Sequence, residues 1–167
     1  MTTVLFTPQA ADAISSLAAM ASDGLETGGI LLGTDDGLAG PIVVRQCGGP
    51  GPAAIRRRSY FRRDLAHAAA LAADAEADGS AWIGEWHTHN IEMPEPSARD
   101  LRTYQALLDD PELAFARILS VVVLADPDSG WLVPQVHAWS FTGTVLRRLA
   151  IDIASPGLSA NQERDMP

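Results

Sequence analysis

The chain has 167 residues, of which 47% are hydrophobic, and its formal net charge is −9. This length allows one well-buried core and is too short for two, so we expect a single domain over residues 1–154. The acidic balance argues against nucleic acid as the main partner, and the lone Cys47 excludes an intrachain disulfide.

Hydrophobic periodicity and turn residues predict an α/β domain. In chain order we expect helices over 8–22, 64–77 and from 97 to before 111, and strands over 27–33, 42–46, 81–89, 117–124 and 131–139. Asp64 is expected to cap the second helix. Residues 126–130 read as a hairpin turn, 141–153 as a strand or a helix, and 155–167 as a disordered polar tail.

The composition also indicates where the protein acts. The N-terminus has no basic stretch followed by an apolar one, so we expect no secretory leader. No window approaches the roughly 18 consecutive apolar residues of a membrane-spanning helix. A cytoplasmic protein without a membrane partner is therefore the default expectation.

The most informative stretch is residues 83–100, IGEWHTHNIEMPEPSARD. His87 and His89 are separated by one residue, so on an extended strand both imidazoles point to the same face and can share one ion. Ser97 is a candidate N-cap of the next helix, and Asp100 falls in its first turn, from where its carboxylate can reach the strand end. Two imidazoles and a carboxylate, with a fourth position open to water, are typical of a catalytic zinc site.

Each half of this pattern also has an ordinary interpretation. Ser-x-x-Asp before a helix is a common capping pattern, and two histidines on one face of a strand often make structural hydrogen bonds. The combination at this spacing is what favours a metal site.

A hydrolytic metal site also needs a general base, which the ligands do not provide. Glu85 shares the strand face of the two histidines, and Glu92 lies on the loop after them. A third and more distinctive candidate, Glu26, begins the glycine-rich apolar segment ETGGILLG. Its glycine pair permits close approach by another backbone.

With Glu26 included, the chain resembles the JAB/MPN metalloproteases, also called JAMM proteases, whose signature is a distant Glu followed by HxH, seven residues and SxxD. The resemblance covers roughly residues 3–140. It is nearest to the prokaryotic branch found beside ubiquitin-like conjugation enzymes, including those of CBASS-type antiviral operons, through GEWHTH at 84–89 and GPGP at 49–52, with arginines and Phe61-x-x-Asp64 after it. Asn90 departs from the family's usual proline after the second histidine, and we expect it to loosen the loop above the metal.

The resemblance implies a single JAB/MPN domain, a cytidine-deaminase-like curved mixed β-sheet flanked by helices. It implies that His87, His89 and Asp100 hold one Zn²⁺ with a bound catalytic water, and that Glu26 is the catalytic base. Ser97 would donate a hydrogen bond to the oxyanion of the tetrahedral intermediate. The sequence leaves open whether Ser97 does this, caps the helix, or alternates between the two.

The positive charge is unevenly distributed. Five of the twelve basic residues are arginines at positions 56–58, 62 and 63, just after a Gly/Pro-rich loop. A solvated face is the plain interpretation. The functional one is that Arg56, Arg57 and Arg58 bind an acidic surface or the C-terminal carboxylate region of a protein substrate, because guanidinium groups pair bidentately with carboxylates.

The resemblance implies a zinc isopeptidase or peptidase that cleaves the amide after the C-terminal glycine of a ubiquitin-like protein, by deconjugation or precursor processing. The partners would be that protein, its conjugates, and cognate ubiquitin-activating and ubiquitin-conjugating homologues. Two alternatives stay open: release of an amino acid from a sulfur-carrier protein in biosynthesis, and a non-catalytic MPN-type scaffold.

Overall fold

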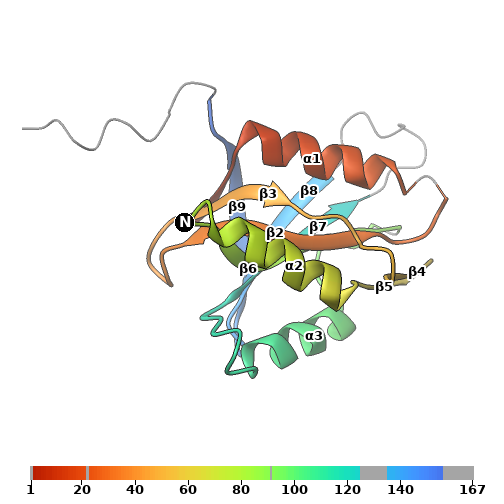
Figure 1. Ribbon diagram of the computed structural model, residues 1–167. Coiled ribbons are helices and arrows are strands. Elements are labelled where there is room, and N and C mark those ends of the chain that lie inside the picture. Colours follow the sequence, from red (N-terminus) through yellow and green to blue (C-terminus); the bar gives the residue numbers. More distant parts are fainter. Residues whose placement is uncertain (1, 22, 91, 125–134, 156–167) are drawn as a thin grey trace, which may run out of the picture.

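The structure is a computed structural model, and it describes residues 2–21, 23–90, 92–124 and 135–155 (Figure 1). The elements in this part of the chain are β1 (Thr3–Phe6), α1 (Pro8–Ala19), β2 (Gly28–Asp35), β3 (Ile42–Cys47), β4 (Ile55–Arg57), β5 (Tyr60–Arg62), α2 (Leu65–Glu76), β6 (Ala81–His89), α3 (Ala98–Leu108), β7 (Ile118–Leu124), β8 (Gln135–Phe141) and β9 (Leu146–Ile153). Among these helices, none is long and apolar enough to cross a bilayer.

The central sheet is mixed, as expected, but it is closed into a barrel in the order β1-β3-β2-β6-β7-β8-β9. β6 pairs with β7 in parallel, and β1 pairs in parallel with both β3 and β9. The neighbours elsewhere in the barrel are antiparallel. The expected curved, flanked sheet is corrected in this one respect, because the short strand β1 joins the two ends of the sheet.

The helices cover the barrel on two sides, as expected (Figure 1 shows α1 and α3 on opposite sides of the strands). α1 packs against the main core, which includes the fully buried Trp86 of β6. α2 covers Ile30 and Leu32 of β2 through small alanines, and α3 buries Tyr104 against Ile118 of β7. Because side chains alternate along a strand, β6 contributes to the core with one face and to the α3 side with the other.

The ends of the helices follow from their capping residues. The side chains of Asp64 and Ser97 accept hydrogen bonds from backbone N–H groups in the first turns of α2 and α3, which confirms both predicted caps. α1 ends at Ala19, before the predicted end at 22. The segment predicted as strand or helix after 141 forms the strand β9. The predicted turn at 126–130, residues 131–134 and the tail from 156 lie outside the described residues.

β4 and β5 form a two-stranded hairpin apart from the barrel, which the sequence analysis missed. Its turn, at Arg58 and Ser59, contains none of the Gly, Asn or Pro residues that usually mark a hairpin. The hairpin packs closely on β2: a Cβ atom added to Gly28 would lie 2.8 Å from Phe61 Cε1 and would collide with the Trp86 carbonyl. Gly28 therefore permits the close approach predicted for the glycine pair.

Candidate metal and catalytic site

Three potential metal ligands meet where β6 ends and α3 begins. The Nε2 atoms of His87 and His89 lie 2.8 Å apart, and Oδ2 of Asp100 lies 3.3 Å from the first and 3.7 Å from the second. One ligand atom from each residue falls within 4.8 Å of the others. Both imidazoles point to one face of the strand, as their spacing predicted.

Two of the ligands, His89 and Asp100, are each oriented by a contact outside the cluster. Nδ1 of His89 lies 2.7 Å from the carbonyl oxygen of Met93, and a carbonyl can only accept. Nδ1 therefore carries the proton, which leaves the Nε2 lone pair for a metal. Oδ2 of Asp100 accepts a hydrogen bond of 2.7 Å from the backbone N–H of Ser97. These orienting contacts and the His-His-Asp donor set fit a zinc ion.

The charges of the cluster also suit a cation. Burial opposes ionisation of Asp100, but hydrogen bonds from His87 and His89 hold the pKa of its carboxyl well below the usual range. Burial lowers the pKa of His89, but the hydrogen bonds to Asp100 and Met93 and the negative charges of Asp100 and Glu26 together outweigh it, so the net shift is upward. The carboxylate is therefore charged, and a proton competes with a metal for the Nε2 lone pair of His89.

Ser97 and Asp100 form a reciprocal capping box, so the ordinary interpretation of Ser-x-x-Asp holds. Oγ of Ser97 accepts the Asp100 N–H at 3.2 Å. A hydroxyl that accepts one hydrogen bond can still donate another. Capping therefore uses the Ser97 hydroxyl only as an acceptor, and the hydroxyl proton can still be donated to a ligand.

Glu26 lies just before β2, across from the metal ligands. Thr88 accepts the backbone N–H of Thr27 at its Oγ1 (2.9 Å) and donates its own N–H to the Thr27 carbonyl (2.8 Å). This pairing brings Glu26 next to His89 in the neighbouring strand. The Glu26 side chain is buried, and burial raises the pKa of its carboxyl to about 7. A carboxyl with this pKa can take up and release a proton near neutral pH.

The other two candidate bases are placed differently. Glu85 is buried and lies 2.7 Å from the Arg63 guanidinium in an ion pair. Burial raises the pKa of Glu85 to about 7 despite this arginine. Glu92 is exposed and lines neither cavity beside the cluster. Glu26 is the candidate that shares a cavity with Ser97, His89 and Asp100.

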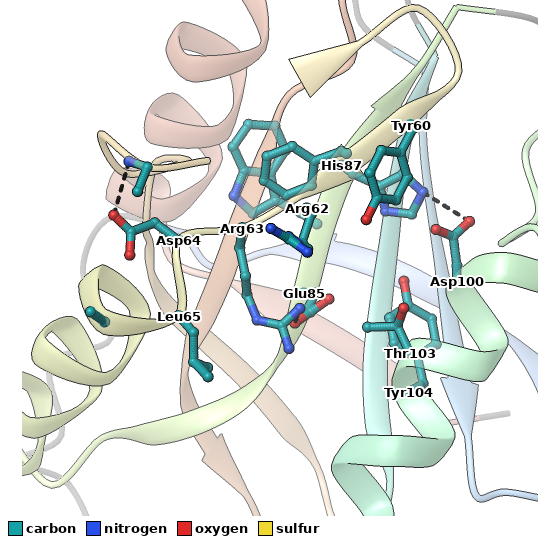
Figure 2. Close-up of a pocket in the computed structure, with 14 residues that line it drawn as sticks. Tyr60, Arg62, Arg63, Asp64, Leu65, Glu85, His87, Asp100, Thr103 and Tyr104 are labelled. Carbon is teal, nitrogen blue, oxygen red and sulfur yellow. Dashed lines mark hydrogen bonds and ion pairs between the residues drawn. The ribbon is translucent and has the colours of Figure 1, made fainter. Parts of the chain in front are cut away.

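Two cavities flank the cluster. The larger, of about 540 Å³, is lined by His87, Glu85 and Arg63, and the smaller, of about 310 Å³, by Glu26, His89 and other residues. Asp100 lines both cavities, together with Tyr60 and Phe61 of β5. Figure 2 shows the larger cavity, with Tyr60 and His87 at one end and the paired Arg63 and Glu85 side chains in its middle. The hairpin therefore borders both sides of the candidate reaction centre.

The three candidate substrate-binding arginines lie on this hairpin, and they differ in their exposure and in their hydrogen bonds within the chain. The guanidinium of Arg56 donates to both carboxylate oxygens of Asp23, at 3.0 and 2.9 Å, and to the carbonyl of Glu26 at 3.2 Å. Arg57 and Arg58 are exposed. A role of all three in substrate binding stays a prediction, but Arg56 already has partners within the chain.

Asn90 and Trp139 make contacts around the site that the sequence did not predict. Nδ2 of Asn90 donates to the carbonyls of Gly24 (2.8 Å) and Arg58 (3.0 Å), so it ties segments together where we expected loosening. Nε1 of Trp139 donates to the carbonyl of Pro94 at 2.8 Å and holds the loop that follows the histidines. The departure of Asn90 from the family pattern was a sequence feature that could have indicated its role. No feature of the sequence around Trp139 indicates its contact with Pro94.

The comparisons with known proteins agree with this arrangement. A solution structure of a protein from Desulfitobacterium hafniense is similar with a TM-score of 0.68 and 19% identity over 91% of this chain and 93% of that one, and it supports the fold alone. A second, from Salinibacter ruber, has a TM-score of 0.57 and 26% identity over 94% of each chain. No curated protein matches. Residues 8–141 match the family of prokaryotic homologs of the JAB domain, and the chain therefore belongs to the JAB/MPN family in its prokaryotic branch.

Proposed function

We propose that the protein is a zinc-dependent isopeptidase or peptidase that cleaves the amide after the C-terminal glycine of a ubiquitin-like protein. The observation that carries the catalytic part is the placement of buried Glu26 in one cavity with His89, Asp100 and Ser97. A metal site without a function in catalysis has no need of a carboxyl whose burial raises its pKa to about 7 beside the ligands.

The proposed roles follow from the atoms available. A zinc ion held by the two Nε2 atoms and Asp100 would polarise the scissile carbonyl and acidify water. Glu26 takes a proton from the attacking water and passes it to the leaving amine. Ser97 donates its free hydroxyl proton to the oxyanion, and its accepted bond from Asp100 N–H holds the hydroxyl in place.

The ubiquitin-like substrate is inferred from the family and from the shape of the site. An extended C-terminal tail can pair with an edge of the β4–β5 hairpin, which stands apart from the closed barrel and borders both cavities. Phe61 packs against Gly28 of β2 and lines both cavities, and from this bulky neighbour we infer a preference for glycine next to the scissile bond. The family context further suggests cytoplasmic partners: activating and conjugating homologues, and an antiviral CBASS-type pathway.

The proposal is tested with candidate ubiquitin-like fusions and conjugates from the same genome. Zinc-loaded protein should release the tail at the C-terminal glycine, and His87→Ala protein should not. Absence of stoichiometric zinc in the purified protein, together with cleavage that resists chelators, would refute the metalloprotease assignment.

Two other functions are separable from this one. A peptidase acting on a sulfur-carrier protein would release a single amino acid from that carrier and would leave ubiquitin-like conjugates uncut. A non-catalytic scaffold would bind partners without hydrolysis, but the ligand set is complete here, and this favours the enzyme.

A further inference from the structure

The part of the chain that carries Glu26 has no regular secondary structure. Residues 23–27, which we call the base segment, precede β2 and lie outside the regular strand, although the Thr27 carbonyl accepts the Thr88 N–H at the end next to β2. The regular ladder with β6 begins only at Gly28. The contacts between Thr27 and Thr88 hold the end of the segment next to β2, so other contacts are needed to fix residues 23–26, which include the catalytic carboxyl.

Side chains from the hairpin and from the end of β6 do this. Arg56 of β4 spans the base segment: it binds Asp23 through two hydrogen bonds and also donates to the carbonyls of Leu25 (3.4 Å) and Glu26 (3.2 Å). The guanidinium is half-buried, and its planar fork matches the Asp23 carboxylate. One side chain thus contacts three residues of the segment.

Asn90 completes the connection from the metal side. It directly follows the ligand His89, and its Nδ2 atom donates both to Gly24 in the base segment and to Arg58 in the hairpin turn. The backbone N–H of Glu26 in turn donates to the carbonyl of Arg57 at 2.8 Å. The usual proline at position 90 has no side-chain donor, so this connection belongs to the chain's own departure from the pattern.

We propose that Arg56 and Asn90 are positioning residues that form a clasp, joining the base segment and the hairpin to the end of β6 so that Glu26 is held beside the metal ligands. This inference rests on the proposed function for its catalytic consequence, but not for its structural one. It assigns Arg56 a role different from substrate binding: loss of Arg56 should misplace the base and lower kcat, whereas loss of a substrate contact would raise KM.

The first test is hydrogen exchange in the full-length protein, and it needs no substrate. Arg56→Gln and Asn90→Ala should each speed amide exchange in residues 23–27 by about tenfold or more, because the segment loses the contacts that keep it closed. Arg57→Gln is the matched control, because the exposed Arg57 side chain makes no hydrogen bond to the base segment. Amide exchange of residues 23–27 should be the same in this variant as in wild type. If Arg56→Gln does not fold, Asp23→Asn serves in its place, because it weakens the Arg56–Asp23 ion pair from the side of the more exposed residue.

The second test is kinetic, on zinc-loaded protein. Arg56→Gln and Asn90→Ala should lower kcat about tenfold with KM within about twofold of wild type, and Arg56→Lys should recover part of the loss. In a Glu26→Gln background, Arg56→Gln should cause no further decrease in kcat, because both changes act through the Glu26 carboxyl. Arg147→Gln, an exposed change on β9, should leave both constants unchanged.

The outcomes separate the two proposals. Unchanged exchange in both variants would overturn the clasp, whatever the activity of the protein. A raised KM with unchanged kcat in Arg56→Gln would also overturn it and return Arg56 to the substrate-binding surface. If wild-type protein cleaves none of the substrates, the proposed function fails while the exchange result still decides the clasp.

Discussion

The two halves of the candidate active site are built in different ways. The metal half, His87, His89 and Asp100, lies on a regular strand and the first turn of a helix, so backbone ladders and a capping box set its geometry. The base half, Glu26, lies on an irregular segment fixed by side chains of other elements. A regular element tolerates loss of a surface contact, but an irregular segment depends on each of the few contacts that hold it.

This difference predicts two classes of variant. Changes to the metal half should act on zinc affinity and activity together. Changes to the base half should lower activity while zinc stays bound.

His87→Ala should abolish activity and weaken zinc binding by more than about 100-fold, because even the loss of a contact behind a ligand typically costs 10–100-fold. Zinc content after dialysis and cleavage of a ubiquitin-like fusion measure the two effects. His67→Ala on α2 is the control, because His67 is outside the cluster. A variant that retained full zinc and activity would remove His87 from the ligand set.

Glu26→Gln should lower kcat by about 10²–10⁴-fold while the protein keeps its zinc, because the amide cannot carry the proton from water to the leaving amine. The measurement pairs metal analysis with kinetics under saturating substrate. Glu92→Gln, at an exposed loop position, should behave as wild type. If Glu26→Gln kept wild-type kcat, Glu85 would become the next base to test.

Ser97→Gly separates the two roles of this residue. Glycine costs only a few tenths of a kcal/mol at an N-cap, whereas the loss of one oxyanion donor costs about 100-fold in kcat. We therefore expect a nearly unchanged melting temperature and a clear kinetic defect. An unchanged kcat would mean that Ser97 serves only as a cap.

A further prediction concerns the dependence of stability on pH in zinc-free protein. Glu26 and Glu85 each have a pKa raised by burial from 4.5 to about 7, so the folded state binds more protons than the unfolded state between these values. Their contribution to stability is full below pH 4.5 and is lost as the pH rises through 7. Urea titrations at pH 4.5–7.5 should show decreasing stability, and less so in Glu85→Gln. A flat profile in this window would contradict the buried, proton-retaining state of both carboxyls.

The sequence was most informative where function and local structure use the same residues. The strand 81–89 was predicted with its exact bounds, and the caps Asp64 and Ser97 fixed where two helices begin. The metal cluster followed from these elements, because alternation on a strand and the first turn of a helix are local rules.

Contacts between distant segments could not be read in this way. The clasp joins Arg56 and Asn90 to the base segment, some 30 and 66 positions away in the chain. The hairpin that carries Arg56 has an arginine-serine turn and strands of three residues, too short for a recognisable alternation. Glu26 was singled out from its place at the head of a glycine-rich apolar segment, and its role as the base came from the family signature, which includes a distant Glu.

The four-residue strand β1 has a consequence for the whole molecule. It lies between β3 and β9, and its backbone pairs with both. Without residues 1–6, those two strands would expose unpaired N–H and C=O groups along facing edges, where a second molecule can add. We therefore expect such a truncated protein to associate or aggregate at concentrations where the full chain stays monodisperse, so that a few residues of the first strand act as the protein's protection against self-association.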